Sequence, residues 1–227
     1  MPDKQHYNYL RQGIKVWNQW RAENLDIRPE LERLIFRFDL SGVNFSDANL
    51  IEANLNTINL SQVNFEQADL NRAKLKQVNL SGANLSGANL RLTDLRRANL
   101  RDANLKGCKL GGANLSGADL RGADLGESDL TVTNLNSANL SQVNLTRAKL
   151  IATQALDTNF HGAILTETEI ENWQISETTQ FEEVTCHYFY RKINQQQRHP
   201  QTGKLAQGEF EKLFQLTTTA TVPTQLN

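Results

Sequence analysis

Few of the residue types that point to a particular chemistry or compartment are abundant in this chain of 227 residues. Aromatic residues make up 7% of it, there are only two cysteines, and the formal net charge is −1. Two cysteines are too few for a disulfide framework, and a charge near zero argues against a general nucleic-acid binder. No apolar run approaches the ~18 residues of a membrane span, and the N-terminal stretch lacks the apolar core of a signal peptide. We therefore expect a cytoplasmic protein without a membrane segment.

The sequence also lacks the constellations that catalysis or metal binding usually needs. No Ser-His-Asp or Cys-His arrangement is evident, and no glycine-rich segment is followed by the Lys-Ser/Thr pair of a phosphate loop. The histidines are not at metal-ligand spacing; they are His6, His161, His187 and His199. We therefore expect a protein that is not an enzyme, with no cofactor, no metal and no catalytic residue.

A period of five residues dominates the middle of the chain. Each of the 23 positions at this spacing from Leu40 to Leu150 is Leu, except for Phe45 and Phe65. A small residue, usually Ala, stands two positions before most of them, and Asn or Asp stands between, so the unit is Ala-Asn-Leu-x-x. The pattern lapses once, at Ala155, before it resumes. Repeats of this kind are typical of solenoids, in which each unit buries its apolar residues against the next.

The period itself selects the type of solenoid. On an α-helix, a step of five residues turns the side chain by about 140°, so the leucines would scatter around the axis. On a flat strand, an odd step alternates between the two faces. A chain that turns a corner every five residues keeps every Leu inside, and four such sides close a square coil of twenty residues. We therefore predict an all-β solenoid of about seven coils, a rod roughly 30–35 Å long at strand spacing.

The repeat resembles the pentapeptide-repeat family, and the resemblance extends over residues 39–178. It implies a right-handed quadrilateral parallel β-helix. Some members of that family protect DNA gyrase and resemble duplex DNA in shape and in strong negative charge. This chain has a net charge of −1 and so lacks that acidity.

Short helical caps are predicted at both ends of the rod. Apolar residues at helical spacing predict one amphipathic helix over residues 6–21 and a short helix over residues 30–36, within an N-terminal cap of residues 1–38. The segment WNQWRAENLDIRP resembles N-terminal caps of cyanobacterial pentapeptide-repeat proteins. Residues 179–216 form a predicted C-terminal cap with a short helix in GEFEKLFQ, and they resemble a C-terminal module of the same proteins. Residues 217–227 are polar and are predicted to be disordered.

Charged residues are unevenly distributed along the repeat. Residues 152–190 contain no Lys or Arg, whereas residues 71–109 are strongly basic. Only Asp94 and Asp102 oppose the nine basic residues there, which are Arg72, Lys74, Lys76, Arg91, Arg96, Arg97, Arg101, Lys106 and Lys109. Lys76 and Arg96 are twenty residues apart and therefore neighbours on adjacent coils. Like charges so placed are mildly unfavourable, so folding alone does not explain them, although an ordinary solvated surface remains an alternative.

Aliphatic residues also occupy outward positions. Leu92, Gly112, Val132 and Ala152 fall in one column, where they could bind a partner or be covered by the C-terminal segment. The predicted partner-binding residues are Arg72, Lys76, Arg91, Leu92, Arg96, Arg97, Arg101 and Val132.

The sequence favours a non-enzymatic scaffold that binds an unidentified protein partner through the flat faces of the rod. The alternatives are a DNA-mimic protein that protects a topoisomerase, a binder of nucleic-acid backbone through the basic residues, and a purely structural role. The near-zero charge makes nucleic acid the less favoured partner. The chain is expected to be a monomer or an end-to-end dimer.

Overall fold

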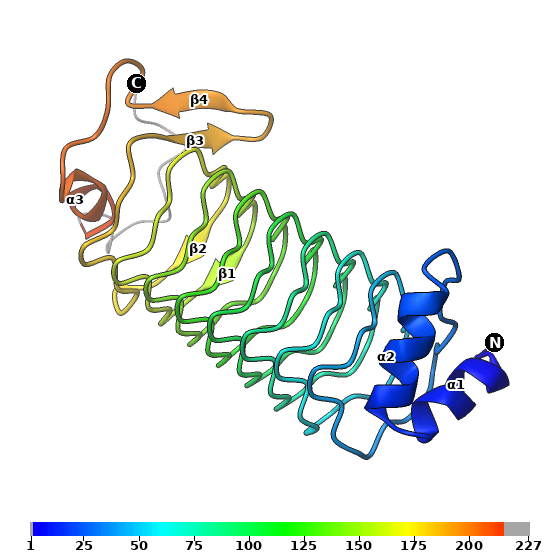
Figure 1. The fold of residues 1–227 in the computed structure, drawn as a ribbon. Helices are drawn as coiled ribbons and strands as arrows, with labels where there is room; N and C mark the ends of the chain where they lie inside the picture. Colours follow the sequence, from blue (N-terminus) through cyan, green and yellow to red (C-terminus); the bar gives the residue numbers. More distant parts are fainter. Residues whose placement is uncertain (1, 216–227) are drawn as a thin grey trace.

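The computed structural model describes residues 2–215; the predicted disordered tail, residues 217–227, lies outside the described residues. The chain winds into a rod of stacked square coils, with two helices at the N-terminal end and a hairpin and a helix at the C-terminal end (Figure 1). The named elements are α1 Lys4–Arg11, α2 Ile14–Glu23, β1 Gln154–Ala155, β2 Gln174–Ile175, β3 Phe189–Lys192, β4 Gln196–His199 and α3 Glu209–Gln215.

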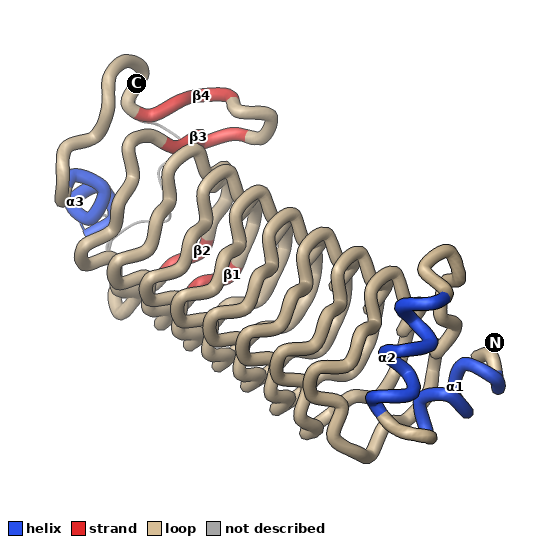
Figure 2. Tube along the Cα trace, in the orientation of Figure 1, coloured by secondary structure: helices blue, strands red, loops and turns tan. Residues whose placement is uncertain are grey.

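The rod itself is a ladder of single parallel bridges between residues twenty apart. Asn64, for example, is bridged to Asn44 on the preceding coil and to Asn84 on the next. The Asn64 N–H donates to Val43 O at 3.0 Å, and the Phe65 N–H donates to Asn84 O at 2.7 Å. Each side of the square is joined to the next coil by a single bridge, so most of the rod is drawn as loop (Figure 2).

A tight turn forms every corner of the square. The Ala83 N–H donates to Leu80 O at 3.0 Å, and this bond recurs at most corners. The third residue of each turn has φ between 50° and 69° at every fifth position from Gly42 to Asn172. Such a positive φ is typical of a type II turn. Only eight of these corner positions are glycine, so the stacked coils hold many other residues in the left-handed region.

The predicted inward positions form the core. Every central Leu from Leu40 to Leu165 is fully buried, together with the Ala two residues before most of them. Burial of one such Leu stabilises the fold by about 1.5–3 kcal/mol. Where Thr replaces the small residue, its hydroxyl donates to a carbonyl, as Thr93 Oγ1 does to Leu70 O at 3.0 Å.

Asn and Asp side chains form a ladder along the rod. Asn79 Nδ2 donates to Asn59 Oδ1 at 3.1 Å, and Asn99 Nδ2 donates to Asn79 Oδ1 at 3.0 Å. The Oδ1 atom of Asn79 also accepts the N–H of Ser81, at 3.2 Å. These residues therefore join neighbouring coils and also hold the start of the following turn.

The N-terminal segment differs from the prediction in two respects. The single helix expected over residues 6–21 is two helices, α1 and α2, separated at Gly13, whose φ is 115°. The helix predicted over residues 30–36 is wrong. Glu30 and Ile35 are bridged to the following coil, and Leu31 and Phe36 are buried five residues apart. This segment is a coil of the rod in a 19-residue register, so the ladder begins before residue 39.

Side chains of α2 occupy the place of a preceding strand along one side of the first coil. Trp17 Nε1 donates to Asn44 O at 2.7 Å, and Asn18 Oδ1 accepts the Asn44 N–H at 2.8 Å. The buried guanidinium of Arg21 donates to Ile27 O at 2.7 Å and to Ser46 O at 3.1 Å. These bonds satisfy backbone groups that a β-edge would otherwise expose.

At the other end, the ladder continues past residue 178 in a 21-residue register, with bridges from Asn159 to Gln180 and from Glu169 to Tyr190. Strands β3 and β4 then pair antiparallel. Helix α3 lies where the sequence predicts a helix, and its Phe210 ring packs on Phe181, with the ring centroids 5.6 Å apart. The apolar interior of the last coil is covered in this way.

Candidate interaction surface

One flat side of the rod collects most of the predicted partner-binding residues. Its midline is the bridged series Lys74, Asp94, Asn114 and Asn134. The corner before this side carries Arg72, Arg91, Leu92 and Val132, and the corner after it carries Lys76, Arg96 and Arg97. We call Arg72, Lys74, Lys76, Arg91, Arg96 and Arg97 the basic face. Seven of the eight predicted residues border this side, whereas Arg101 lies one corner further on.

Four cations of the basic face form no ion pair. Within the described residues, no hydrogen bond or ion pair is made by the side chains of Arg72, Lys74, Lys76 and Arg97. Three lie on one coil, across the full width of the side, and Arg97 lies on the next. Lys74 was not among the predicted partner-binding residues. Its spacing of twenty residues from Asp94 is the sequence signal that places it at the centre of this side.

The other arginines are paired with carboxylates. Arg96 forms a two-bond ion pair with Asp94, with Nε to Oδ1 at 2.8 Å and Nη2 to Oδ2 at 2.6 Å. These bonds hold the pKa of Asp94 below its ordinary value, and nearby Lys76 adds a smaller lowering. Arg91 Nη2 reaches Asp129 Oδ2, two coils away, at 3.4 Å.

These ion pairs correct the expectation that folding alone does not explain the like charges on adjacent coils. Lys76 and Arg96 are not an unrelieved like-charge pair, because Asp94 forms an ion pair with Arg96 and attracts Lys76 at longer range. Asp119 likewise lies 3.8 Å from Arg101 Nε and 2.6 Å from Arg121 Nη2. Folding therefore accommodates these neighbours, and the unpaired cations are the stronger indication of an interaction surface.

Exposed aliphatic residues border the basic face along one corner. Leu92 is 54% exposed and Val132 is 56% exposed, two coils apart in the same column. Gly112 lies between them, and a methyl group there would come within 2.9 Å of Leu92 Cδ2, so the Leu92 side chain lies over Gly112. We call Leu92, Val132 and Ala152 the aliphatic edge. The C-terminal segment was a possible cover for this column, but it leaves Leu92 and Val132 exposed.

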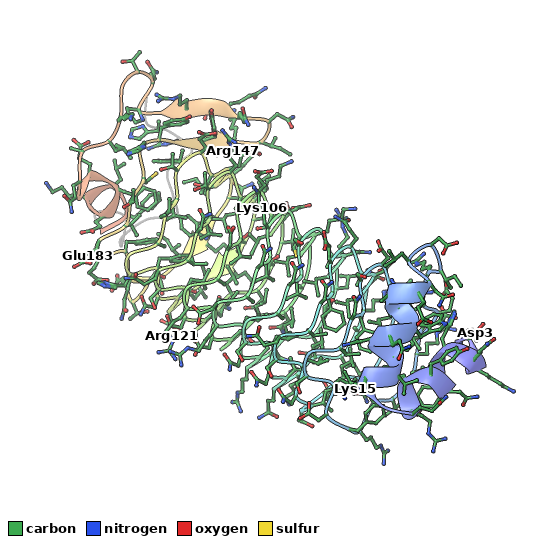
Figure 3. All side chains as sticks on the ribbon, viewed as in Figure 1. Asp3, Lys15, Lys106, Arg121, Arg147 and Glu183 are labelled. Carbon is green, nitrogen blue, oxygen red and sulfur yellow. The ribbon has the colours of Figure 1, made fainter. Side chains whose placement is uncertain are left out.

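Cations outside the basic face are spread around the rod. Lys106 and Arg147 project along one edge and Arg121 along another (Figure 3). Lys106 is 3.4 Å from Glu127, and Arg147 Nε is 2.6 Å from Glu167. These exposed pairs contribute little to stability.

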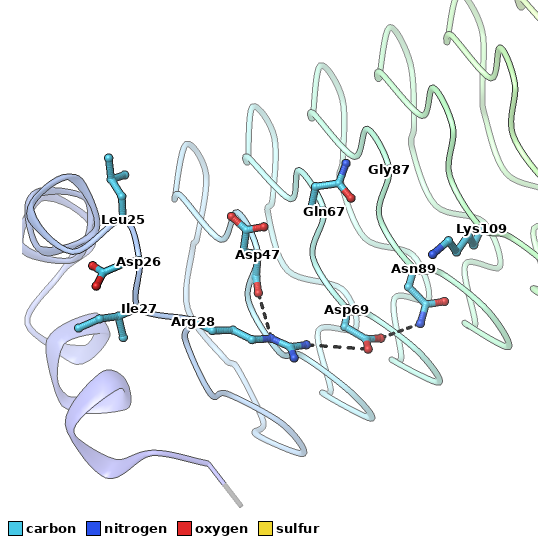
Figure 4. Close-up of a pocket in the computed structure, with 10 residues that line it drawn as sticks. All are labelled: Leu25, Asp26, Ile27, Arg28, Asp47, Gln67, Asp69, Gly87, Asn89 and Lys109. Carbon is cyan, nitrogen blue, oxygen red and sulfur yellow. Dashed lines mark hydrogen bonds and ion pairs between the residues drawn. The ribbon is translucent and has the colours of Figure 1, made fainter.

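A separate surface groove of about 670 Å³ lies where the loop after α2 crosses the first coils (Figure 4). Arg28 crosses it, donating from Nε to Asp47 O at 3.2 Å and lying 4.0 Å from Asp69. Its walls are open and mostly polar, with Asp26 and Lys109 among the lining residues. The groove therefore differs from the enclosed apolar pocket that small-molecule sites favour.

Neither thiol is placed for nucleophilic chemistry. Cys108 and Cys186 are buried, and burial raises the pKa of each to about 12. A thiolate is the reactive form, so these thiols are inert at neutral pH. In residues 2–215, no group of three or more His, Cys, Asp or Glu side chains is placed to hold a metal ion.

A family model for pentapeptide repeats matches the chain in eight copies, through overlapping segments that run from residue 39 to residue 166. The chain belongs to the pentapeptide-repeat family. The parallel square ladder is therefore the right-handed β-helix of that family.

Among solved structures, this pentapeptide-repeat protein is similar to one from the thylakoid lumen of Arabidopsis thaliana, with 40% identity and a TM-score of 0.41. That alignment covers 41% of this chain and 65% of the Arabidopsis protein, so it spans less than two thirds of that relative. Another is HetL of Nostoc sp. strain PCC 7120, which is involved in heterocyst differentiation regulation. It shows 22% identity and a TM-score of 0.27, over 74% of this chain and 93% of HetL.

A third is QnrB1, a plasmid-mediated fluoroquinolone resistance protein, with 18% identity and a TM-score of 0.39, over 69% of this chain and 88% of QnrB1. A comparison with curated proteins finds no match. Within residues 2–215, this pentapeptide-repeat protein has no helix long and apolar enough to cross a membrane.

Proposed function

We propose that this pentapeptide-repeat protein is a non-enzymatic interaction protein of the cytoplasm that binds a protein partner through one flat side of its rod. In this proposal, the helical ends close a rod of about seven coils, and the sides present side chains in fixed rows. The basic face supplies the binding site, with Arg72, Lys76 and Arg97 as its principal contacts. The supporting observation is that its unpaired cations gather on one side, beside an aliphatic edge.

Charge of this kind favours association in a specific way. A cation without an intramolecular partner does not have to break an ion pair before it binds a carboxylate. Its attraction to the partner therefore adds to the binding free energy without that cost. Complementary charge increases the rate of encounter and selects against partners of the wrong sign. Arg96 contributes less, because Asp94 already occupies its guanidinium.

The DNA-mimic alternative requires a strongly negative rod, whereas this chain has a net charge of −1. Direct binding of nucleic acid through the basic face predicts a steep loss of affinity with salt, with a slope of about 0.9 per phosphate contacted. A supercoiling assay with a topoisomerase and a salt titration with duplex DNA separate these alternatives from protein binding.

The test is affinity capture from the lysate of the source organism, with wild type compared to the triple variant Arg72→Glu, Lys76→Glu, Arg97→Glu. None of these cations is paired, so the variant removes no ion pair. A control with the same change in charge is Lys4→Glu, Arg11→Glu, Lys15→Glu on the exposed surface of α1 and α2.

We expect a captured protein that disappears with the basic-face variant and persists with the control. Identical captures from all three proteins would show that the basic face is not the binding site. Loss with both variants would show that only net charge matters.

A further inference from the structure

The aliphatic edge contains two residues that folding does not favour. Leu92 has φ 58° and Val132 has φ 59°. Positive φ is tolerated by Gly and Asn but is strained for bulky side chains, and for a β-branched residue it is an outlier. Both residues are more than half exposed, so burial offsets little of this strain. Backbone strain clusters at functional sites such as ligand clamps, and Leu92 and Val132 are the strained corners of this rod that also expose large aliphatic side chains.

The spacing of the edge indicates the shape of what binds there. Successive corners in one column are about 4.8 Å apart, the distance between neighbouring strands. An α-helix laid along the rod advances about 5.4 Å per turn. From Leu92 to Ala152, three coil steps and three helical turns therefore differ by less than about 2 Å. An extended strand along the same line presents one side chain per ~6.8 Å and loses register after the first step.

The charges beside the edge indicate the chemistry of that helix. Arg72 lies in the same column, one coil before Leu92, with Lys74 and Lys76 on the same coil, and all three are unpaired. Towards the C-terminal end, the midline of the side carries Asn114, Asn134 and Gln154, which are uncharged. A helix with aliphatic residues on one face and carboxylates beside one end of that face is complementary to this arrangement. A nucleic-acid backbone would pair with the cations but would leave Leu92 and Val132 without a partner.

We propose that the aliphatic edge and the unpaired cations next to it bind one acidic amphipathic helix of a partner protein, laid parallel to the rod axis. The inference rests on the proposed function and names the class of partner. The helix places one side chain per turn against successive coils, with aliphatic residues recurring every three to four positions. Its carboxylates meet Arg72, Lys74 and Lys76.

The test is selection of a random 16-residue peptide display library on the full-length protein, followed by fluorescence anisotropy with the enriched peptides. Two variants probe the site: Leu92→Asn with Val132→Asn, and Arg72→Gln, Lys74→Gln with Lys76→Gln. Asn tolerates positive φ, so the first variant retains the fold. The matched control is Gln62→Asn with Gln142→Asn, which makes the same kind of change at two corner positions of another edge.

We expect enriched peptides that are acidic, have aliphatic residues every three to four positions, and gain helical circular dichroism on binding. Each site variant is expected to weaken binding at least tenfold, while the control leaves it unchanged. No enrichment, or enriched peptides that are extended or insensitive to the Leu92 and Val132 substitutions, would overturn the inference. If lysate capture still depended on the basic face in that case, the helix would be wrong and the proposed function would stand. Loss of both results would remove the function as well.

Discussion

Replacing Val132 by Asn is expected to make the protein more stable, although replacing an aliphatic residue by a polar one usually destabilises a fold. Positive φ costs about 1–2 kcal/mol for a residue with a Cβ, and Asn tolerates it best among the polar residues. Val132 is 56% exposed, so less than half of the ~1.5 kcal/mol available from burying Val is lost on substitution. The difference leaves Val132→Asn more stable by about 0.5–1 kcal/mol.

Urea denaturation followed by circular dichroism measures this difference, as a higher midpoint with an unchanged slope. Ser137→Asn is the control, because Ser137 has a similar φ of 57° without a branched side chain. It should change stability by less than Val132→Asn does. A Val132→Asn variant less stable than wild type by ~1 kcal/mol or more would show that Val132 makes stabilising contacts. The reasoning that assigns this residue to binding would then fail.

Three further outcomes follow from the same structure. Leu115→Ala should destabilise the rod by about 3–5 kcal/mol in chemical denaturation, because it leaves a cavity among fully buried residues. In the native protein, Cys108 and Cys186 should not react with a thiol reagent at pH 8, because burial raises the pKa of each thiol to about 12. Both should react once the protein is unfolded in about 8 M urea. Asp94 has a lowered pKa in the folded state, so its contribution to stability is complete above the unfolded-state pKa of about 4 and is lost as the pH falls below it. Asp94→Asn should therefore show a smaller loss of stability on acidification than wild type, measured by urea titration at pH 6 and pH 3.

The five-residue period predicted the fold because it is a geometric signal that neither a helix nor a flat strand can satisfy. The first coil escaped prediction for a local reason. Leu31 and Phe36 keep the five-residue spacing, but Leu40 follows Phe36 after a step of only four, so the segment falls out of register with the repeat. Its clustered apolar residues then resemble a helical stripe. The last coil was missed in the same way, because one extra residue precedes Phe181.

The candidate site was partly predictable for a related reason. Counting in twenties assigns each charged residue to a side and a coil, and this places the basic face. It does not show which cations are paired, because the Asp94 to Arg96 ion pair depends on how two side chains of one coil turn toward each other. The strain at Leu92 and Val132 was also hidden, since the sequence alone did not show that this corner position has positive φ throughout the rod.

The square coil also makes the rod adjustable in fixed steps. Each side uses five residues, so inserting one five-residue unit after Leu115 would keep every central Leu inward while turning all the following sides by a quarter turn. Val132 would move from the edge it shares with Leu92 to the edge that carries Arg97. Inserting twenty residues would restore the orientation and lengthen the rod by about 4.8 Å. Small insertions of repeat units thus change the combination of side chains that a partner meets, without any change to the core.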